Sequence, residues 1–417
     1  HHRNHHVPNV EFKCHRSLPV HSCACFLNYR LEIGVHYTLL ILMSPPWSDS
    51  FRLRDSVIAR AEFFHRRCAH KLIDIIVIAI LALICGALSV EDIEDFAIER
   101  EDWLRRFLEL PNGIPSHDTI ARVLTIVNQS QVEKIFAEWV QGVAEKLSID
   151  SQTISLDGKS VKGTEREFNG KHRPLHLVTA YSHELGLVLA QASSKSSGLA
   201  ETKAALECLG ALDIIGKTIL VDAGLGTKKL AQTVTRSGGF FITPIKQNHK
   251  KTCDALVEAF AAHPSLKGVT TVDNDHGRQE ERAAVVLPAT ELPPAILEGW
   301  SGVCCLVKIT RVRTTKDKRF VNQTRQEDGT ITYELNTTEY QTSREDSYYL
   351  SSRELTPELA LKLIRQHWGI ENNLHWVLDT AFLEDDWLVT TKRLAQSLSL
   401  LPFVRTCLLY TSPSPRD

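Results

Sequence analysis

The sequence contains no pair of cysteines at Cys-X-X-Cys spacing, although ten cysteines are scattered along its 417 residues. It therefore indicates neither a zinc knuckle nor a regular disulfide framework, and this cysteine usage is typical of a reducing compartment. The chain also lacks an excess of one charge: its formal net charge is −2, whereas nucleic-acid-binding domains are usually basic. A neutral total still permits a local basic patch.

The sequence lacks an apolar run long enough to cross a membrane. The strongest run, residues 75–85, extends at most to Leu88, which is shorter than the roughly 20 residues that a membrane-spanning helix needs. We therefore expect a buried helix here and no membrane partner. A membrane protein built on residues 75–88 is the alternative, and cell fractionation separates the two.

Methionine occurs once, at position 43, and both ends of the chain differ in character from the middle. Residues 1–42 are rich in His and Cys without a sustained period. We expect them to be disordered, non-native upstream translation, with a metal-binding tail as the alternative. Residues 401–417 include "LLYTSPSPRD", which resembles a translated sequencing adapter, so we expect an artefactual or truncated tail.

Apolar residues recur at helical spacing between residues 43 and 150. The pattern predicts helices over 71–88, after Ser89, from Ser116, and after Ser130, where Glu133 completes a capping box. Four short helices joined by tight turns predict an all-helical N-terminal domain at 43–150. It could bind DNA or act as a scaffold, because no separate recognition helix stands out.

The pattern changes to alternating strands and helices after residue 151. Strands are expected at 153–157, 175–182 and 185–193, followed by a helix at 199–212, a buried strand at 217–224, a helix, and a buried strand at 240–246. This order predicts an α/β domain with a mixed sheet and matches a ribonuclease-H-like fold. Residues from about 253 to 350 carry β-type runs among Asp, Gly, Pro and Thr, which predicts a β-rich insertion.

One carboxylate, Glu371, stands among apolar and aromatic residues in "HWGIENNLHW" (367–376). The sequence "TPE" at 356–358 predicts the start of its helix. The helical spacing of His367, Leu374 and Leu378 places Glu371 on an apolar face and predicts that it points inward. A buried carboxylate needs a positive partner or a hydrogen bond. A buried histidine is one candidate, and a cation is the other.

Two aspartates, Asp157 and Asp222, close predicted strands. Each alone is most simply a cap of the following turn. In α/β sheets, however, sites form at the carboxyl ends of strands, and the first and fourth strands of a ribonuclease-H-like sheet are neighbours. Three carboxylates that converge repel one another unless cations lie between them, and oxygen-only ligands favour Mg²⁺ or Mn²⁺.

Six sequence blocks, in the same order, resemble the H-repeat-associated (Rhs-linked) family of bacterial insertion-sequence transposases in the DDE superfamily. They span about residues 68–385 and read "KLIDIIVIAILALICG", "LRRFLELPNGIPSHDTIARVL", "SLDGKSVKGT", "LHLVTAYSHELGLVLAQ", "ILVDAG" and "RQHWGIENNLHWVLDTAF". The resemblance implies a ribonuclease-H-like catalytic domain at 151–400. It also implies that Asp157, Asp222 and Glu371 are the catalytic residues and bind two Mg²⁺ or Mn²⁺ ions.

The same resemblance implies the reaction and its partners. We expect metal-dependent cleavage of double-stranded DNA at terminal inverted repeats, followed by strand transfer into target DNA. We also expect a homodimer acting on paired ends, no small-molecule substrate, and a nucleoid-associated location in the bacterial cytoplasm.

Positive side chains near the acids are the expected DNA contacts, since phosphates dominate DNA binding. Residues 223–252 include several Lys and Arg residues and no acid, and Lys246 with Asn248 resembles the family's Lys-X-Asn motif. A solvated basic helix face is the alternative for this stretch, and a partner for Glu371 is the alternative for His367. The predicted DNA-binding residues are Lys159, Lys162, Lys228, Lys229, Lys246, Asn248, Lys250, Lys251 and His367.

Two stretches depart from the family pattern. After Asp222 the chain reads "AGLGTKK" where relatives commonly have Met-Gly-Cys-Gln, and after "EDDW" the expected basic segment and closing helix are degraded. A decayed, catalytically inactive copy that only binds DNA is therefore the alternative function.

Overall fold

The computed structural model describes residues 69–126, 152–165, 167–168, 171–172, 174–194, 199–275, 278–316, 320–326, 331–335, 340–380 and 384–386. All of these belong to one compact unit, Cys68–Tyr410. The helix expected after Ser130 and the segments 1–42 and 401–417 lie outside the described residues.

The first described segment is helical, as the sequence predicted. Its helices are α5 (Leu72–Ile84), α6 (Val90–Glu99), α7 (Glu101–Leu104) and α8 (His117–Ile126). Ser89 forms the predicted helix start: Asp92 N–H donates to Ser89 Oγ at 3.1 Å, and Ser89 N–H donates to Asp92 Oδ2 at 3.0 Å. Across the described ranges, no helix combines the length and apolar character that crossing a bilayer requires.

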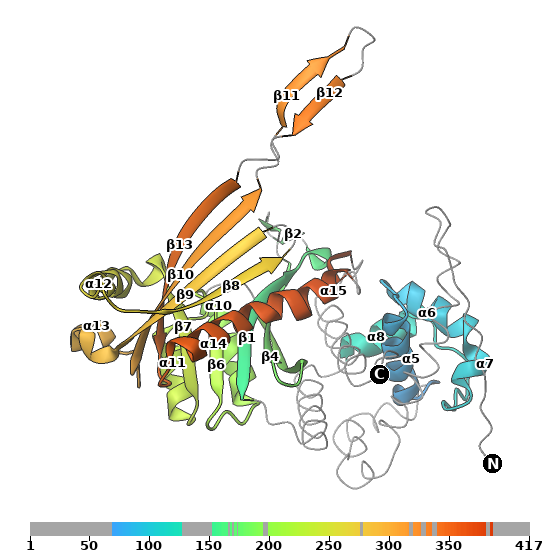
Figure 1. Ribbon diagram of the computed structural model, residues 1–417. Coiled ribbons are helices and arrows are strands. Elements are labelled where there is room, and N and C mark those ends of the chain that lie inside the picture. Colours follow the sequence, from blue (N-terminus) through green and yellow to red (C-terminus); the bar gives the residue numbers. More distant parts are fainter. Residues whose placement is uncertain are drawn as a thin grey trace, which may run out of the picture. The chain divides into compact units, whose positions relative to one another are not determined.

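The second segment is a mixed α/β structure built on a nine-stranded sheet (Figure 1). Its order is β5-β4-β1-β6-β7-β13-β10-β9-β8, in which only the β1–β6 and β6–β7 pairs are parallel. The strands are β1 (Thr153–Val161), β4 (Leu175–Ser182), β5 (Leu187–Ser194), β6 (Thr218–Val221), β7 (Phe240–Ile245), β8 (Val269–Asp275), β9 (Arg278–Pro288), β10 (Cys305–Lys316) and β13 (Tyr340–Ser351). Two small hairpins pair β2 (Glu167–Phe168) with β3 (Lys171–His172) and β11 (Phe320–Arg325) with β12 (Ile331–Leu335).

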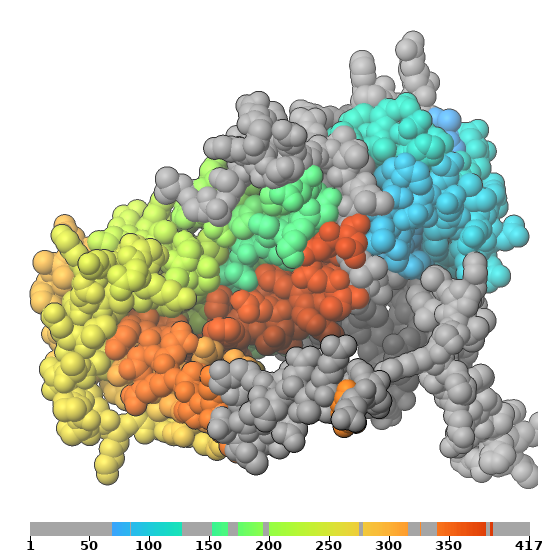
Figure 2. Space-filling model, turned by 90° about the horizontal axis from the view of Figure 1, so that it is seen from above, coloured from blue at the N-terminus to red at the C-terminus, as the bar shows by residue number. Residues whose placement is uncertain are grey.

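Helices cover both faces of this sheet, which is why β4 and β6 are buried at every position. On one face, α10 (Leu199–Gly210) packs on β4 and β5, and α11 (Lys228–Arg236) packs on β7 and contacts α10. On the other face, α14 (Pro357–Ile370) crosses β1 and β6 and reaches β9 and β10 (Figure 1). Figure 2 shows α14 and the helical segment after it, in red, lying along the strands drawn in green.

The helix α14 is anchored in an apolar core shared by the parallel strands and the insertion. Thr356 begins the helix as predicted, because its side chain accepts a hydrogen bond from Leu359 N–H. Burial of each large apolar side chain contributes roughly 1.5–3 kcal/mol. The core residues are Leu220, Ile242, Ala284, Val307, Ile309, Leu355, Ala360, Leu361, Leu363 and Ile364.

The predicted β-rich insertion is present but begins later than residue 253. Residues Lys250–Ala261 form α12, and strands β8 to β13 follow, with the short α13 (Pro294–Leu297) between β9 and β10. The insertion extends the same sheet, because β13 pairs with β7 and β10 with β13. It therefore gives α14 a wider surface on which to pack.

Candidate active site

The first two predicted acids lie side by side at the end of a parallel strand pair. The register of β1 with β6 runs from Thr153 opposite Thr218 to Leu156 opposite Val221. Asp157 follows Leu156 within β1, Asp222 is the first residue after β6, and neighbouring strands are about 4.8 Å apart. The expected adjacency of the first and fourth strands is therefore confirmed.

Asp157 does not end its strand, contrary to the prediction. β1 continues to Val161 because residues up to Val161 pair with β4. Gly158 allows this continuation beside α10: a Cβ there would lie 1.9 Å from Glu201 Oε1, which pairs with His176 Nε2 at 2.9 Å. Since side chains alternate along a strand, Asp157 points to the opposite face, where α14 lies.

The carboxylate of Asp157 is held in a confined, negatively charged position. Its side chain is 15% exposed, Gly158 N–H donates to Oδ1 at 2.9 Å, and His375 Nδ1 lies 3.4 Å from Oδ2. Burial, and after it the charges of Asp222 and Glu371, raise the pKa of Asp157 from its usual 3.8 to about 7, against the lowering effect of the Gly158 hydrogen bond. The three predicted acids are thus close enough to interact electrostatically.

Asp222 begins a loop that is held in place from two sides. Leu225 N–H donates to Asp222 Oδ1 at 2.8 Å, so the aspartate does cap the following turn, which was the simpler reading of its position. From the turn after β7, Asn248 Nδ2 donates to the Ala223 carbonyl at 2.8 Å, and His249 Nε2 lies 2.9 Å from the Gly226 carbonyl. Asn248 therefore supports the loop that carries Asp222, and its predicted contact with DNA stays a prediction.

Glu371 is exposed, and the prediction that it points inward is wrong. The buried stripe of this helix consists of Ile370, Leu374 and Leu378, which are at most 2% exposed. Trp368, next to His367, is 50% exposed and lies outside this stripe as well. A π-helical turn begins at Glu371 and ends at His375, and such turns are frequent at functional sites. Glu371 is thus open to solvent, and its charge still acts on Asp157.

A chain of polar contacts connects α14 to β1 on the side of Asp157. His367 Nδ1 lies 3.2 Å from Ser155 Oγ, which lies 2.6 Å from His183 Nε2. The partner of His367 is therefore Ser155 rather than Glu371. Burial lowers the pKa values of His367 and His183 to about 4, so both are neutral near pH 7. This contact engages Nδ1 of His367 inside the protein, which weighs against its predicted role as a phosphate contact.

Lys159 does not fit its predicted DNA-binding role. Its side chain is only 12% exposed, and Nζ donates to Asp379 Oδ1 at 2.5 Å and to Glu384 Oε2 at 2.6 Å. Two carboxylates inside the protein therefore engage its ammonium group. Lys162, by contrast, is 78% exposed and pairs with Asp385 at 2.8 Å.

The remaining predicted DNA contacts are exposed. Lys228 and Lys229 lie at the start of α11, where Lys228 Nζ donates to the Glu298 carbonyl at 2.5 Å. The others gather where η3 (Gln247–His249) leads into α12, next to the Asp222 loop; they are Lys246, Asn248, Lys250 and Lys251.

The chemistry of the three acids fits a hard divalent cation. Carboxylate oxygens suit Mg²⁺, and a cation would offset both causes that raise the pKa of Asp157, its burial first and then the charges of Asp222 and Glu371. Within the described part of the chain, no three His, Cys, Asp or Glu side chains are grouped closely enough to enclose one metal ion. This does not conflict with Mg²⁺, which usually takes one or two carboxylates together with water and substrate phosphates.

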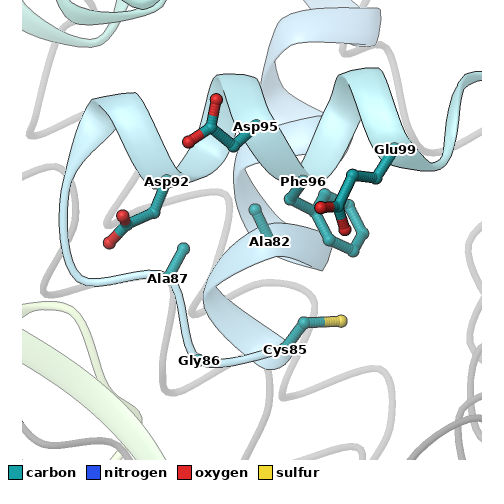
Figure 3. Close-up of a pocket in the computed structure, with 8 residues that line it drawn as sticks. All are labelled: Ala82, Cys85, Gly86, Ala87, Asp92, Asp95, Phe96 and Glu99. Carbon is teal, nitrogen blue, oxygen red and sulfur yellow. The ribbon is translucent and has the colours of Figure 1, made fainter. Parts of the chain in front are cut away.

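A pocket of about 260 Å³ lies in the helical segment, between α5 and α6 (Figure 3). It is lined by Ala82, Cys85, Gly86, Ala87, Asp92, Asp95, Phe96 and Glu99. None of the predicted site residues lines it, and Asp92 is already used by the helix start at Ser89. The pocket does not belong to the candidate active site.

The residues that join β1 to the helix of Glu371 were not predicted from the sequence. His375, Asp379 and Glu384 contact Asp157 or Lys159, although none was assigned a role. The spacing of two of them could have indicated a shared helix face, because His375 and Asp379 follow Glu371 at intervals of four residues.

Comparison with known proteins gives matches along most of the chain. Residues 64–140 match the family described as DDE_Tnp_1-associated, and residues 141–401 match the transposase DDE domain. The chain is 32% identical to the "Putative transposase YncI" of Escherichia coli O157:H7, over 76% of this chain and 76% of that protein. It is 30% identical to the "H repeat-associated putative transposase YhhI" of Escherichia coli K12, over 79% and 82% of the two chains.

Two further matches are more limited. The "Inactive transposase YbfQ" of Escherichia coli K12 is 49% identical over 59 residues, which is 14% of this chain and 70% of that protein. A cryo-EM structure of the piggyBac transposase synaptic complex with hairpin DNA matches at a TM-score of 0.33 and 8% identity, covering 82% of this chain and 73% of that one. A likeness at that TM-score supports no argument here. From the family matches and the two longer relatives, the chain belongs to the H-repeat-associated family of DDE transposases.

Proposed function

We propose that this protein is an active DDE transposase of a bacterial insertion sequence. In this proposal it cleaves DNA strands at the terminal inverted repeats of its element with the help of divalent cations, and it joins the freed ends to target DNA. Asp157, Asp222 and Glu371 are the proposed catalytic and metal-binding residues. The domain carrying them, at 151–400, is proposed to be ribonuclease-H-like and to follow a helical domain at 43–150.

The observation that carries the proposal is that the charges of Asp222 and Glu371 both act on the confined carboxylate of Asp157. The parallel register brings Asp157 next to Asp222, and the charge of Glu371 acts on Asp157 from another element of the fold. Accumulated negative charge of this kind is costly in a protein and is typical of sites that hold cations. The strand order β5-β4-β1-β6-β7, with two parallel pairs after an antiparallel hairpin, supports the ribonuclease-H-like assignment.

The protein side chains would have two tasks in this reaction. The three carboxylates would bind Mg²⁺ or Mn²⁺, which when bound would supply Lewis-acid activation of the attacking and leaving oxygens. The exposed Lys246, Lys250 and Lys251 would orient the DNA backbone beside Asp222, with Lys162, Lys228, Lys229 and Asn248 extending the contact. A homodimer on paired transposon ends is part of the proposal.

The test uses purified protein and DNA that carries the inverted repeats bracketing the reading frame. We expect nicking at the repeat ends that requires Mg²⁺ or Mn²⁺, and loss of nicking in Asp157→Ala, Asp222→Ala and Glu371→Ala. Asp254→Ala, which removes an exposed acid on α12, is the matched control and should nick like the wild type. Nicking by all three variants at the wild-type rate contradicts the proposal.

A decayed copy that only binds repeat DNA is the second candidate. It is favoured by the degraded segment after residue 387 and by the match to a relative named as inactive. Wild-type protein that shifts repeat DNA in a gel, but cleaves none with either cation, would support this candidate over the first.

A further inference from the structure

One face of strand β1 is joined at three levels to the helical segment that carries Glu371. Ser155 contacts His367 at 3.2 Å, and Asp157 contacts His375 at 3.4 Å. Lys159 contacts Asp379 at 2.5 Å. The strand residues are two apart and therefore share a face. These three contacts form a seam between β1 and the helical segment, and the contact of Asp157 lies in the middle of this seam.

Lys159 makes a second contact at its level of this seam. Besides Asp379, its ammonium group contacts Glu384 in the turn η6 (Glu384–Asp386), and the Glu384 side chain is 1% exposed. Burial raises the pKa of Glu384, whereas the Lys159 charge next to it lowers that pKa. A buried charge is tolerated only when it is paired and hydrogen-bonded. This ion pair therefore holds β1 and η6 together, because separating them would leave the charges of Lys159 and Glu384 unpaired inside the protein.

The π-helical turn makes this link sensitive to geometry. Trp376 N–H donates to the Glu371 carbonyl, five residues earlier, where an α-helix would use a residue four earlier. An additional residue in a helix rotates the following side chains by about 100°. Asp379 lies after this turn, so the direction of its side chain toward Lys159 depends on the rotation.

We propose that Lys159, Asp379 and Glu384 form a clamp that fixes β1 against the helix of Glu371 and thereby sets the spacing of Asp157 and Glu371. Lys159 is a positioning residue, and its place within the seam explains why it is unavailable to DNA. This inference rests on the proposed function, because the spacing matters for cations that the carboxylates share.

The experiment removes the charges of Lys159 and Glu384 together, so that neither remains buried without its partner. Removing one partner of a buried ion pair leaves an uncompensated charge, whereas neutral residues of similar shape at both positions preserve folding. The test variant is therefore Lys159→Met/Glu384→Gln, in which the partly exposed Asp379 remains solvated. The control is Lys203→Met/Glu207→Gln, which removes an exposed ion pair on α10.

Mn²⁺ binding is measured directly, by the loss of the electron paramagnetic resonance signal of the free ion, in full-length protein without DNA. We expect the test variant to unfold near the wild-type temperature and to bind repeat DNA in EDTA like the wild type. Its Mn²⁺ affinity should fall by about 10-fold or more, the usual effect of residues that orient metal ligands. The control should bind Mn²⁺ like the wild type.

Two outcomes overturn the inference in distinguishable ways. If Asp157→Ala loses Mn²⁺ binding while Lys159→Met/Glu384→Gln retains wild-type affinity, the clamp has no positioning role. If Asp157→Ala and the wild type bind Mn²⁺ equally, the cation site of the proposed function is wrong and the clamp's role falls with it. Asp379→Asn, which removes only the partly exposed partner, provides a milder variant should the double variant not fold; unchanged Mn²⁺ affinity in it also contradicts the clamp.

Discussion

Replacing Asp157 by Asn should make the metal-free protein more stable. In the folded protein the pKa of Asp157 is about 7, compared with 3.8 as its ordinary value, and burial is the largest cause. An acid whose pKa is raised on folding destabilises the folded state as pH rises from the unfolded pKa to the folded one. The loss of folding stability caused by Asp157 is therefore absent below about pH 4 and reaches its full size above about pH 7.

The size of this effect follows from the shift. A difference of about three pH units corresponds to about 4 kcal/mol at most, since each unit is about 1.4 kcal/mol. The side chain retains 15% exposure and the unfolded chain keeps residual structure, so we expect about 1–3 kcal/mol. Asn has nearly the same shape, and its amide oxygen still accepts the hydrogen bond from Gly158 N–H.

The assay is urea unfolding of the wild type and Asp157→Asn in EDTA at pH 8 and at pH 4.5. We expect Asp157→Asn to be more stable at pH 8 and to lose most of this advantage at pH 4.5. Adding Mg²⁺ at pH 8 should then stabilise the wild type more than the variant, because only the wild type retains the full carboxylate set. A variant that is equally or less stable at pH 8 would refute the electrostatic reasoning about this site.

Three further changes test other parts of the structure. Thr356→Ala should destabilise the protein by about 1 kcal/mol in urea unfolding, because it removes the side-chain cap of α14, and Thr356→Ser should restore most of the loss. Gly158→Ala should cost about 1–3 kcal/mol because its Cβ would displace Glu201, whereas Gly210→Ala, with no atom within 4 Å, should not show this loss. Stability should fall as pH drops from about 6.5 toward 4, because burial lowers the pKa of His183 in the folded protein to about 4. In His183→Gln this fall in stability should be smaller by about 2–3 kcal/mol, and a fall as large as in the wild type would contradict the reasoning.

Local sequence signals predicted the elements of the fold well where one residue type dictates the geometry. Ser89 and Thr356 begin helices where their side chains predicted it, and the apolar runs before Asp222 and after Ser237 are buried strands. The end of β1 was missed because Gly and Lys after Asp157 are poor strand formers, and pairing with β4 overrides that preference. The catalytic roles of the three acids stay predictions.

The site was less predictable because it depends on contacts between distant segments. A helical projection placed Glu371 on the apolar face, but one position on a helix corresponds to about 100° of rotation, and Ile370 rather than Glu371 lies in the buried stripe. Likewise, Lys159 looked like a free cation because its partners are more than 200 positions away in the sequence. Neither spacing nor composition encodes such a pairing.

The three acids and the large sheet are physically connected. Keeping Asp157 close to Asp222 and Glu371 costs stability without a cation, so other parts of the fold must hold these elements together. The helix of Glu371 meets this need through α14, whose apolar side chains pack on strands of both the parallel core and the insertion. The insertion therefore stabilises the helix that carries the third acid. On this argument, shortening β9 and β10 would loosen the helix of Glu371 before it affected the pairing of β1 with β6.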